Sequence, residues 1–166
     1  MAKVIAVTNQ KGGVGKTTSA VNISYYLAKA GKRVLLIDLD PQGNATSGLG
    51  IDKTNLETTM GEVLLQTATL EKAVVPTEHA NLFLAPTTSH LANVEVELAK
   101  GERKFTRLKA AIQTVEEQYD IVIIDSPPSL SLLTVNSLIA AKYVLLPVQA
   151  EFYALEGLGQ LLETMK

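Results

Sequence analysis

A glycine-rich segment between two lysines holds the residues of this chain best suited to bind phosphate. Its glycines let successive backbone N–H groups turn toward an anion, and a helix expected to start at Lys16 adds its own unpaired N–H groups. The Lys16 ammonium suits the β- and γ-phosphates of a nucleoside triphosphate, and the Thr17 hydroxyl suits Mg²⁺. A ligand-free turn would explain the glycines but not the run Gly-Lys-Thr. The pattern predicts a phosphate-binding loop made of Lys11, Gly12, Gly13, Val14, Gly15, Lys16, Thr17 and Thr18.

This loop departs in one respect from the common pattern G-x-x-x-x-G-K-[ST]. Gln10 stands where that pattern has its first glycine, and Lys11 adds a second lysine five residues before Lys16. Lys11 cannot easily share the position of Lys16 on the same phosphates. Two interpretations stay open: a solvated surface charge, the commonest fate of lysine, or a contact with the phosphate of another bound nucleotide.

Three aspartates follow apolar runs that are typical of buried strands. Asp125 comes directly after 121–124, and Asp38 and Asp40 close the run 34–37. Ligands of open α/β sheets bind beyond the carboxyl ends of the strands, so all three carboxylates should face the nucleotide. Asp125 has the placement of an acid that holds Mg²⁺ through water. Taken alone, such an aspartate more often caps a turn, and it is the phosphate-binding loop that favours the metal role.

Composition and the remaining residue types exclude several classes of protein. There is no cysteine, which excludes disulfides, Cys-ligated zinc, iron–sulfur clusters and thiol nucleophiles. The dinucleotide fingerprint G-x-G-x-x-G is not met, which argues against hydride transfer. His79 and His90 lie outside the clusters above and are expected at the surface. The net charge of −2 indicates no basic nucleic-acid binder, and no apolar stretch of about 18 residues could span a membrane.

The order of elements predicts an α/β fold with a doubly wound, mainly parallel sheet of the P-loop NTPase type. Strands are expected at 4–7, 34–37, 82–85, 121–124 and 143–148, and helices at 16–30, 60–68, 103–117 and 130–141. Residues 42–58 are expected to form a loop. Residues 1–166 should form a single ATPase domain. Because a last helix over 158–165 has no stop signal, we expect further strands of the sheet to be missing at the C-terminal end.

Four motifs in order resemble the deviant Walker A ATPases of the ParA/MinD family, and its ParA/Soj branch in particular. They are the loop 11–18, the segment Asp38-Leu39-Asp40-Pro41-Gln42-Gly43-Asn44, the segment Asp125-Ser126-Pro127-Pro128-Ser129-Leu130, and residues 147–157. The resemblance runs along the whole chain. Relatives that carry iron–sulfur clusters need cysteines, and the MinD branch typically lacks the Pro-Gln-Gly-Asn and Pro-Pro-Ser runs.

The resemblance implies a role for each site residue. Lys11 would reach across an ATP-sandwich dimer to the partner's nucleotide, and Asp40 would position or activate the attacking water. Lys16 and Thr17 match the phosphate lysine and the Mg²⁺ hydroxyl, Asp125 matches the Walker B acid, and Asp38 would support the metal shell. The implied cofactors are ATP and Mg²⁺.

The resemblance also implies a function, namely a slow, partner-stimulated ATPase that switches by dimerisation in chromosome or plasmid partitioning. Its implied partners are a second copy of the chain, a ParB-like activator and DNA bound without sequence preference, in the cytoplasm on the nucleoid and without a membrane. The DNA surface and the adenine-binding residues are expected beyond residue 166. The alternative is a MinD-like or other placement ATPase that uses a membrane or protein partner.

Overall fold

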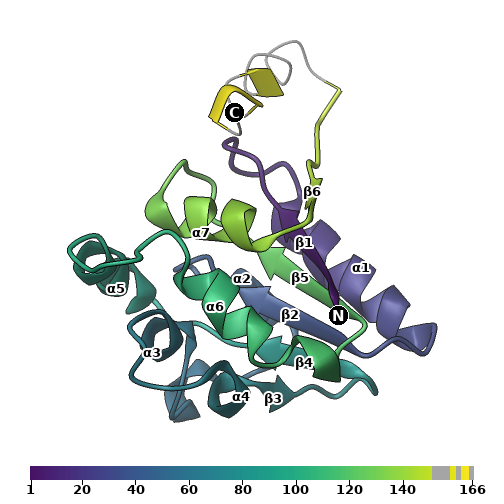
Figure 1. Ribbon diagram of the computed structural model, residues 1–166. Coiled ribbons are helices and arrows are strands. Elements are labelled where there is room, and N and C mark those ends of the chain that lie inside the picture. The colour runs from purple at the N-terminus through teal and green to yellow at the C-terminus, as the bar shows by residue number, and fades with distance from the viewer. Residues whose placement is uncertain (151–157, 160–161, 165–166) are drawn as a thin grey trace.

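A six-stranded sheet forms the centre of the molecule (Figure 1). The computed structural model describes residues 1–150, 158–159 and 162–164. In this part of the chain the strand order is β3-β4-β2-β5-β1-β6. Neighbouring strands are parallel except for the short edge strand β3, which runs antiparallel to β4. The strands are β1 (Lys3–Val7), β2 (Val34–Asp38), β3 (Val75–Pro76), β4 (Leu82–Ala85), β5 (Ile121–Asp125) and β6 (Tyr143–Leu145).

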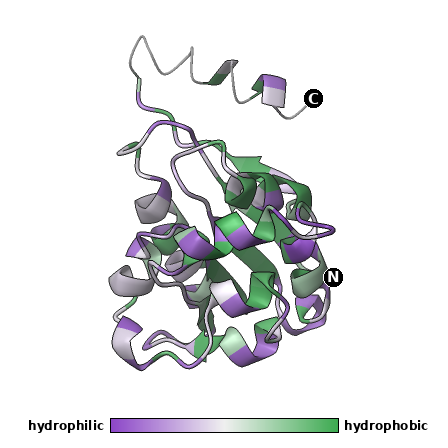
Figure 2. Ribbon diagram, turned by 90° about the vertical axis from the view of Figure 1, so that its left-hand side faces the viewer, coloured by the Kyte–Doolittle hydropathy of each residue, from purple (hydrophilic) through white to green (hydrophobic). Residues whose placement is uncertain are grey.

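Helices cover both faces of the sheet, which confirms the doubly wound α/β fold. One apolar core lies between the sheet and α1 (Lys16–Lys29) and α2 (Asn44–Gly48). The other lies under the remaining helices, α3 (Met60–Leu64), α4 (Leu70–Ala73), α5 (Leu91–Leu98), α6 (Arg107–Gln113) and α7 (Leu132–Ala140). Figure 2 shows hydrophobic strands inside and helices that alternate hydrophobic and hydrophilic stretches, as elements with one buried face do.

The strands expected at 4–7, 34–37, 82–85 and 121–124 are confirmed, and each but the third is longer by one residue. The strand expected over 143–148 ends at Leu145 instead, because its partner β1 ends at Val7, which is paired with Leu145. The helix expected over 158–165 lies largely outside the described residues. Both histidines are exposed, as expected.

The regions between the strands differ more from expectation. The predicted loop 42–58 contains α2 and a 3₁₀ turn, Lys53–Asn55, and the predicted helix 60–68 ends at Leu64. The predicted helix 103–117 is shortened at both ends to α6. On the N-terminal side Arg103 has a left-handed φ of 54°, through which no helix can pass. A further 3₁₀ turn follows α6 at Glu116–Gln118. Helices α4 and α5 and strand β3 were not predicted, since their apolar patterns are too short to stand out.

The register of the sheet sets the position of the candidate site. Asp38, the last residue of β2, lies beside Asp125, the last residue of β5, and Asp125 also pairs with Val7 at the end of β1. The carboxyl ends of the three central strands therefore meet at one edge, where the loops to α1, α2 and α7 begin. No helix among the described residues has the length and apolar composition needed to cross a bilayer.

Candidate nucleotide site

The loop between β1 and α1 surrounds a cavity at the N-terminus of α1. Gly13 and Gly15 have positive φ angles of 72° and 86°, which only glycine adopts without strain, and Gly15 is the N-cap of α1. No side chain caps this helix, so its first backbone N–H groups point toward the cavity. The cavity has a volume of about 280 Å³ and is lined by Gly12, Gly13, Gly15, Lys16, Thr17, Thr18, Asp40, Gln42, Asn44 and Pro128.

The Lys16 ammonium lies inside this loop. The residue is only 6% exposed, and its Nζ donates a hydrogen bond to the Lys11 carbonyl oxygen at 2.9 Å. Burial lowers the pKa of Lys16, while the negative charges of Asp125 and Asp40 oppose that shift. An ammonium that is held by one carbonyl has further N–H groups to donate, and a bound phosphate is the strongest acceptor it could find there.

Thr17 joins the start of α1 to the end of β5. Its hydroxyl donates to Asp125 Oδ2 at 2.7 Å, and the other carboxylate oxygen of Asp125, Oδ1, is buried and accepts no hydrogen bond from the residues that the structure describes. Burial raises the pKa of Asp125 to about 7, and the neighbouring charges of Asp38 and Asp40 add to the rise. The Thr17 hydrogen bond and Lys16 oppose it. A buried carboxylate oxygen without a partner, next to a hydroxyl, is suited to a hard cation such as Mg²⁺.

The donor set fits a magnesium ion that is shared with a phosphate. Within the described residues no group of three or more His, Cys, Asp or Glu side chains is gathered closely enough to hold a metal. Mg²⁺ is commonly bound through one or two carboxylates together with waters and substrate phosphates. Thr17 and Asp125 supply what such an arrangement requires from the protein.

Asp38 is fully buried, and both of its carboxylate oxygens accept hydrogen bonds from the loop that follows β2. Oδ2 accepts from the Thr46 backbone N–H at 2.8 Å and from the Thr46 hydroxyl at 2.7 Å, and Oδ1 accepts from the Asp40 N–H at 3.2 Å. Burial raises the pKa of Asp38 to about 6, against the effect of these hydrogen bonds. Asp38 therefore fixes the shape of the segment that carries Asp40, a role that the sequence did not reveal.

Asp40, which follows β2, also lines the cavity at the phosphate loop. It is 7% exposed, and its Oδ1 accepts a hydrogen bond from the Gln42 N–H at 2.9 Å. Its carbonyl oxygen accepts from Gly43, which has a φ of 63° and is packed so closely that a Cβ would lie 2.6 Å from Lys53 Nζ. The turn after Asp40 is thus held in one conformation, with a carboxylate facing the cavity.

Lys11 lies apart from the lining of the cavity. It is exposed, and its backbone is fixed because its N–H donates to Asn9 Oδ1 at 3.0 Å and its carbonyl accepts from Lys16. The two lysines of the loop are therefore placed differently: Lys16 inside, Lys11 outside. This placement leaves the role of Lys11 toward a second nucleotide as a prediction.

The segment after β6 is attached to the phosphate loop. The Asn9 side-chain amide donates to the Pro147 carbonyl at 2.8 Å, and the Gln149 side-chain amide donates to the Gly13 carbonyl at 3.3 Å. Neither contact was predicted from the sequence. Gln42, Asn44 and Pro128 were also missed as site residues, although they lie in the motifs quoted above, because a motif does not say which of its residues face the ligand.

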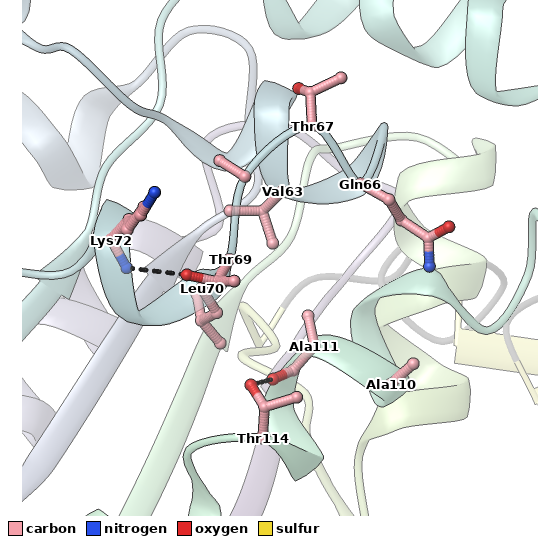
Figure 3. Close-up of a pocket in the computed structure, with 10 residues that line it drawn as sticks. Val63, Gln66, Thr67, Thr69, Leu70, Lys72, Ala110, Ala111 and Thr114 are labelled. Atoms are coloured by element: carbon pink, nitrogen blue, oxygen red, sulfur yellow. Dashed lines mark hydrogen bonds between the residues drawn. The ribbon is translucent and has the colours of Figure 1, made fainter.

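A second cavity, of about 440 Å³, lies between α6 and the segment that joins α3 to α4 (Figure 3). The side chains that Figure 3 labels are those of small, hydroxyl-bearing or apolar residues together with Gln66 and Lys72. No carboxylate or histidine lines it, and no residue of the predicted site does. Most of the residues predicted to bind nucleotide line the cavity at α1, and none of them lines this one.

The sequence matches one family model and is similar to curated proteins along its whole length. A family model described as an AAA domain matches residues 2–166. The chain is 52% identical to the sporulation initiation inhibitor protein Soj of Bacillus subtilis over 100% of its own length and 66% of that protein. It is 48% identical to the chromosome partitioning protein ParA of Myxococcus xanthus, over 99% of this chain and 58% of that protein. The chain thus spans less than two thirds of the length of these relatives.

Among solved structures, one similar chain was determined with a bound ATP analogue and magnesium. It is described as cobyrinic acid a,c-diamide synthase from Mycobacterium smegmatis. The two chains are 43% identical, with a TM-score of 0.94 over 99% of this chain and 67% of that one. At this identity and TM-score, the two chains share their fold over nearly the whole length of this one.

Proposed function

Because this chain belongs to the ParA/Soj family, we propose that it binds and hydrolyses ATP with Mg²⁺ and uses the nucleotide to switch between monomer and dimer in the partitioning of chromosomal or plasmid DNA. The observation that carries the proposal is the grouping of four residues at the carboxyl ends of three neighbouring strands. Lys16, Thr17 and Asp40 line one cavity at the open N-terminus of α1, and the buried Asp125 accepts a hydrogen bond from the Thr17 hydroxyl.

In this proposal residues 1–166 act as one ATPase domain, and the phosphate loop binds the triphosphate. The N–H groups of the loop and of the first turn of α1 donate to phosphate oxygens, and the positive end of the helix dipole favours the same anion. The Lys16 ammonium, which now donates one hydrogen bond to the Lys11 carbonyl, donates its other N–H groups to the β- and γ-phosphates. Thr17 and Asp125 would hold Mg²⁺, with Asp38 beside them. When bound, the ion neutralises negative charge on the phosphates.

Hydrolysis requires a water molecule in line with the bond from the γ-phosphorus to the leaving oxygen. Asp40 Oδ1 accepts a hydrogen bond from the Gln42 N–H. Asp40 Oδ2 accepts none from the described residues, so this oxygen can accept a hydrogen bond from the water. The water oxygen bonds to the γ-phosphorus while the bond from that phosphorus to the β-phosphate oxygen breaks. The proton of the water passes by way of Asp40 Oδ2 to an oxygen of the released phosphate, and ADP and phosphate leave. Lys16 donates to oxygens on which negative charge accumulates.

The switch needs a group that senses the nucleotide of a second copy. We assign this role to Lys11, which lies on the outside of the loop while its carbonyl accepts the hydrogen bond from Lys16. A neighbouring copy would place its triphosphate against this ammonium, so that ATP favours the dimer and hydrolysis releases it. The remaining partners in the proposal are a ParB-like activator and DNA on the nucleoid.

The proposal is tested by measuring nucleotide binding and turnover in the full-length protein. Calorimetry with ATP and Mg²⁺ should give a single site per chain, and turnover should be slow until the activator and DNA are added. Failure of the protein to bind ATP in the presence of Mg²⁺ would refute the proposed function. ATP-dependent association with vesicles in place of DNA would favour a placement ATPase instead.

A further inference from the structure

The turn that joins α5 to α6 carries an unusual density of positive charge. Five of the ten residues 100–109 are Lys or Arg, and one is acidic, in a chain whose net charge is −2. We call the five, Lys100, Arg103, Lys104, Arg107 and Lys109, the basic turn. The rest of the chain has ten basic and sixteen acidic residues, so the basic turn is a local excess of positive charge in an otherwise acidic chain.

Among the described residues, no carboxylate forms an ion pair with this charge. The one ion pair in that part of the chain joins the N-terminus to Glu117 and includes none of the five cations. Lys104 Nζ donates to the Ala99 carbonyl at 3.2 Å, and Arg107 donates to the Glu102 carbonyl at 2.8 Å. A carbonyl oxygen shapes a turn but carries no net charge. The basic turn therefore attracts an external anion, and the attraction depends on salt.

The turn is also held in shape by the helix behind it. Asn136 of α7 is fully buried; its side-chain amide donates to the Lys104 carbonyl at 2.7 Å, and its Oδ1 accepts from the Leu108 N–H at 3.2 Å. Arg103 has a left-handed φ of 54°, and its carbonyl accepts from the Thr106 N–H at 3.0 Å. Cations on a turn that is already ordered lose little conformational entropy when they bind.

The chemistry of the turn distinguishes between possible anions. Phe105 is 46% exposed, and Lys104 Nζ lies 5.4 Å from the centre of its ring. A membrane-binding helix would present several large apolar side chains beside its cations, but Leu108 and Ile112 of α6 are turned into the core. Five cations with a single exposed aromatic side chain among them suit a row of phosphates better than a lipid surface.

We propose that the basic turn contacts the phosphate backbone of double-stranded DNA without reading its sequence. The proposal rests on the proposed function, in which DNA is a partner, and assigns to it a surface inside residues 100–109. The resemblance discussed above had placed the DNA surface beyond residue 166. Because the contact is to phosphates, binding should weaken steeply with salt and depend little on base composition.

The test compares two triple variants of the full-length protein with the same change in charge. The first is Lys100→Gln, Arg103→Asn, Lys109→Gln, which spares the two cations that brace the backbone and places Asn, which tolerates a positive φ, at position 103. The control is Lys29→Gln, Lys32→Gln, Lys72→Gln, three exposed lysines elsewhere. Binding to a random-sequence duplex is measured by fluorescence anisotropy with ATP and Mg²⁺ at several salt concentrations.

We expect the first variant to bind DNA at least about tenfold more weakly. The slope of log K against log salt should become less steep by about 2 to 3, because each lost phosphate contact reduces its magnitude by about 1. The control should lose less than about threefold. Glu102→Gln, which removes the single acid of the turn, should bind more tightly than the parent, an effect that a folding defect cannot mimic. Equal losses in the two triple variants, or an unchanged slope in the first, would overturn the proposal.

Further measurements separate this inference from the function on which it rests. ATP affinity and turnover without DNA should be the same in the parent and in both triple variants. A parent that binds and hydrolyses ATP but does not bind the duplex overturns the inference alone, whereas a parent that does not bind ATP counts against the proposed function. If the basic turn is needed for binding to phosphatidylserine vesicles or to polyglutamate but not to DNA, the assigned partner is wrong.

Discussion

The carboxylate of Asp40 is the group whose loss should separate nucleotide binding from hydrolysis. In the parent the Gln42 backbone nitrogen lies 2.9 Å from Asp40 Oδ1. Asp40→Asn keeps the shape of the side chain and an oxygen that accepts this hydrogen bond, but it removes the negative charge. Asp40→Ala removes both. Because Lys16, Thr17 and the backbone of the loop stay in place, we expect both variants to bind ATP about as well as the parent.

The two variants should differ in stability but not in turnover. Loss of a positioned base or water-orienting carboxylate typically slows a reaction by about 10², which corresponds to about 2.7 kcal/mol in the barrier. Asp40→Ala also loses the hydrogen bond that closes the turn at Gln42, and it should be about 1 to 2 kcal/mol less stable to unfolding. Asp40→Asn should stay within about 0.5 kcal/mol of the parent.

The assay is steady-state release of phosphate in the presence of activator and DNA, with ATP affinity by calorimetry and stability by urea unfolding. In sizing experiments both variants should remain dimers with ATP, since the nucleotide is retained. Near-normal turnover in Asp40→Asn would assign the water-positioning role to another group. Loss of ATP binding in Asp40→Asn, with stability unchanged, would make Asp40 part of the metal site and refute the reasoning.

Three further substitutions test other parts of the site. Lys16→Ala removes the buried ammonium at the phosphates and should lower ATP affinity at least about tenfold by calorimetry; unchanged binding would contradict the phosphate-loop assignment. Lys11→Ala should leave ATP affinity within about threefold but abolish ATP-dependent dimers in sizing experiments, and a variant that still dimerises would exclude a contact across the dimer. Thr46→Val removes a hydroxyl donor from the buried carboxylate of Asp38 and should cost about 1 to 3 kcal/mol in urea unfolding, whereas Thr54→Val, at an exposed site, should cost less than about 0.5 kcal/mol; equal effects would mean that the Asp38 contact contributes nothing.

The sequence predicted the sheet well and the connections poorly, for a physical reason. Strands buried on both faces are uniformly apolar, so a run such as 121–124 stands out from its neighbours. Helix α5 has eight residues and α4 has four, and a periodic pattern of that length is hard to distinguish from a loop. The predicted helix 103–117 begins only at Arg107, after the left-handed backbone of Arg103, a conformation that local propensities do not predict.

Candidate site residues could be predicted where chemistry limits the choice of residue type. Glycines before Lys-Thr at the start of a helix have few other uses, and next to them an aspartate at the end of a buried strand predicts a metal-binding acid. The structure joins Thr17 to Asp125 by a hydrogen bond. Gln42, Asn44 and Pro128 could not be identified in this way, because their side chains are common in turns and their orientation depends on the fold around them.

What the sequence by itself determined is therefore the fold class, the phosphate loop and the edge of the sheet at which the carboxylates lie. Only the tertiary structure decided what each carboxylate does, because burial and hydrogen-bond partners come from residues far away in the chain. Asp38 and Asp125 both end buried strands and pair in register. Asp38 accepts hydrogen bonds from Thr46, whereas Asp125 accepts one from Thr17 and has a buried oxygen that accepts none from the described residues. A strand pattern fixes where a side chain emerges, whereas the groups it meets depend on how distant loops pack against it.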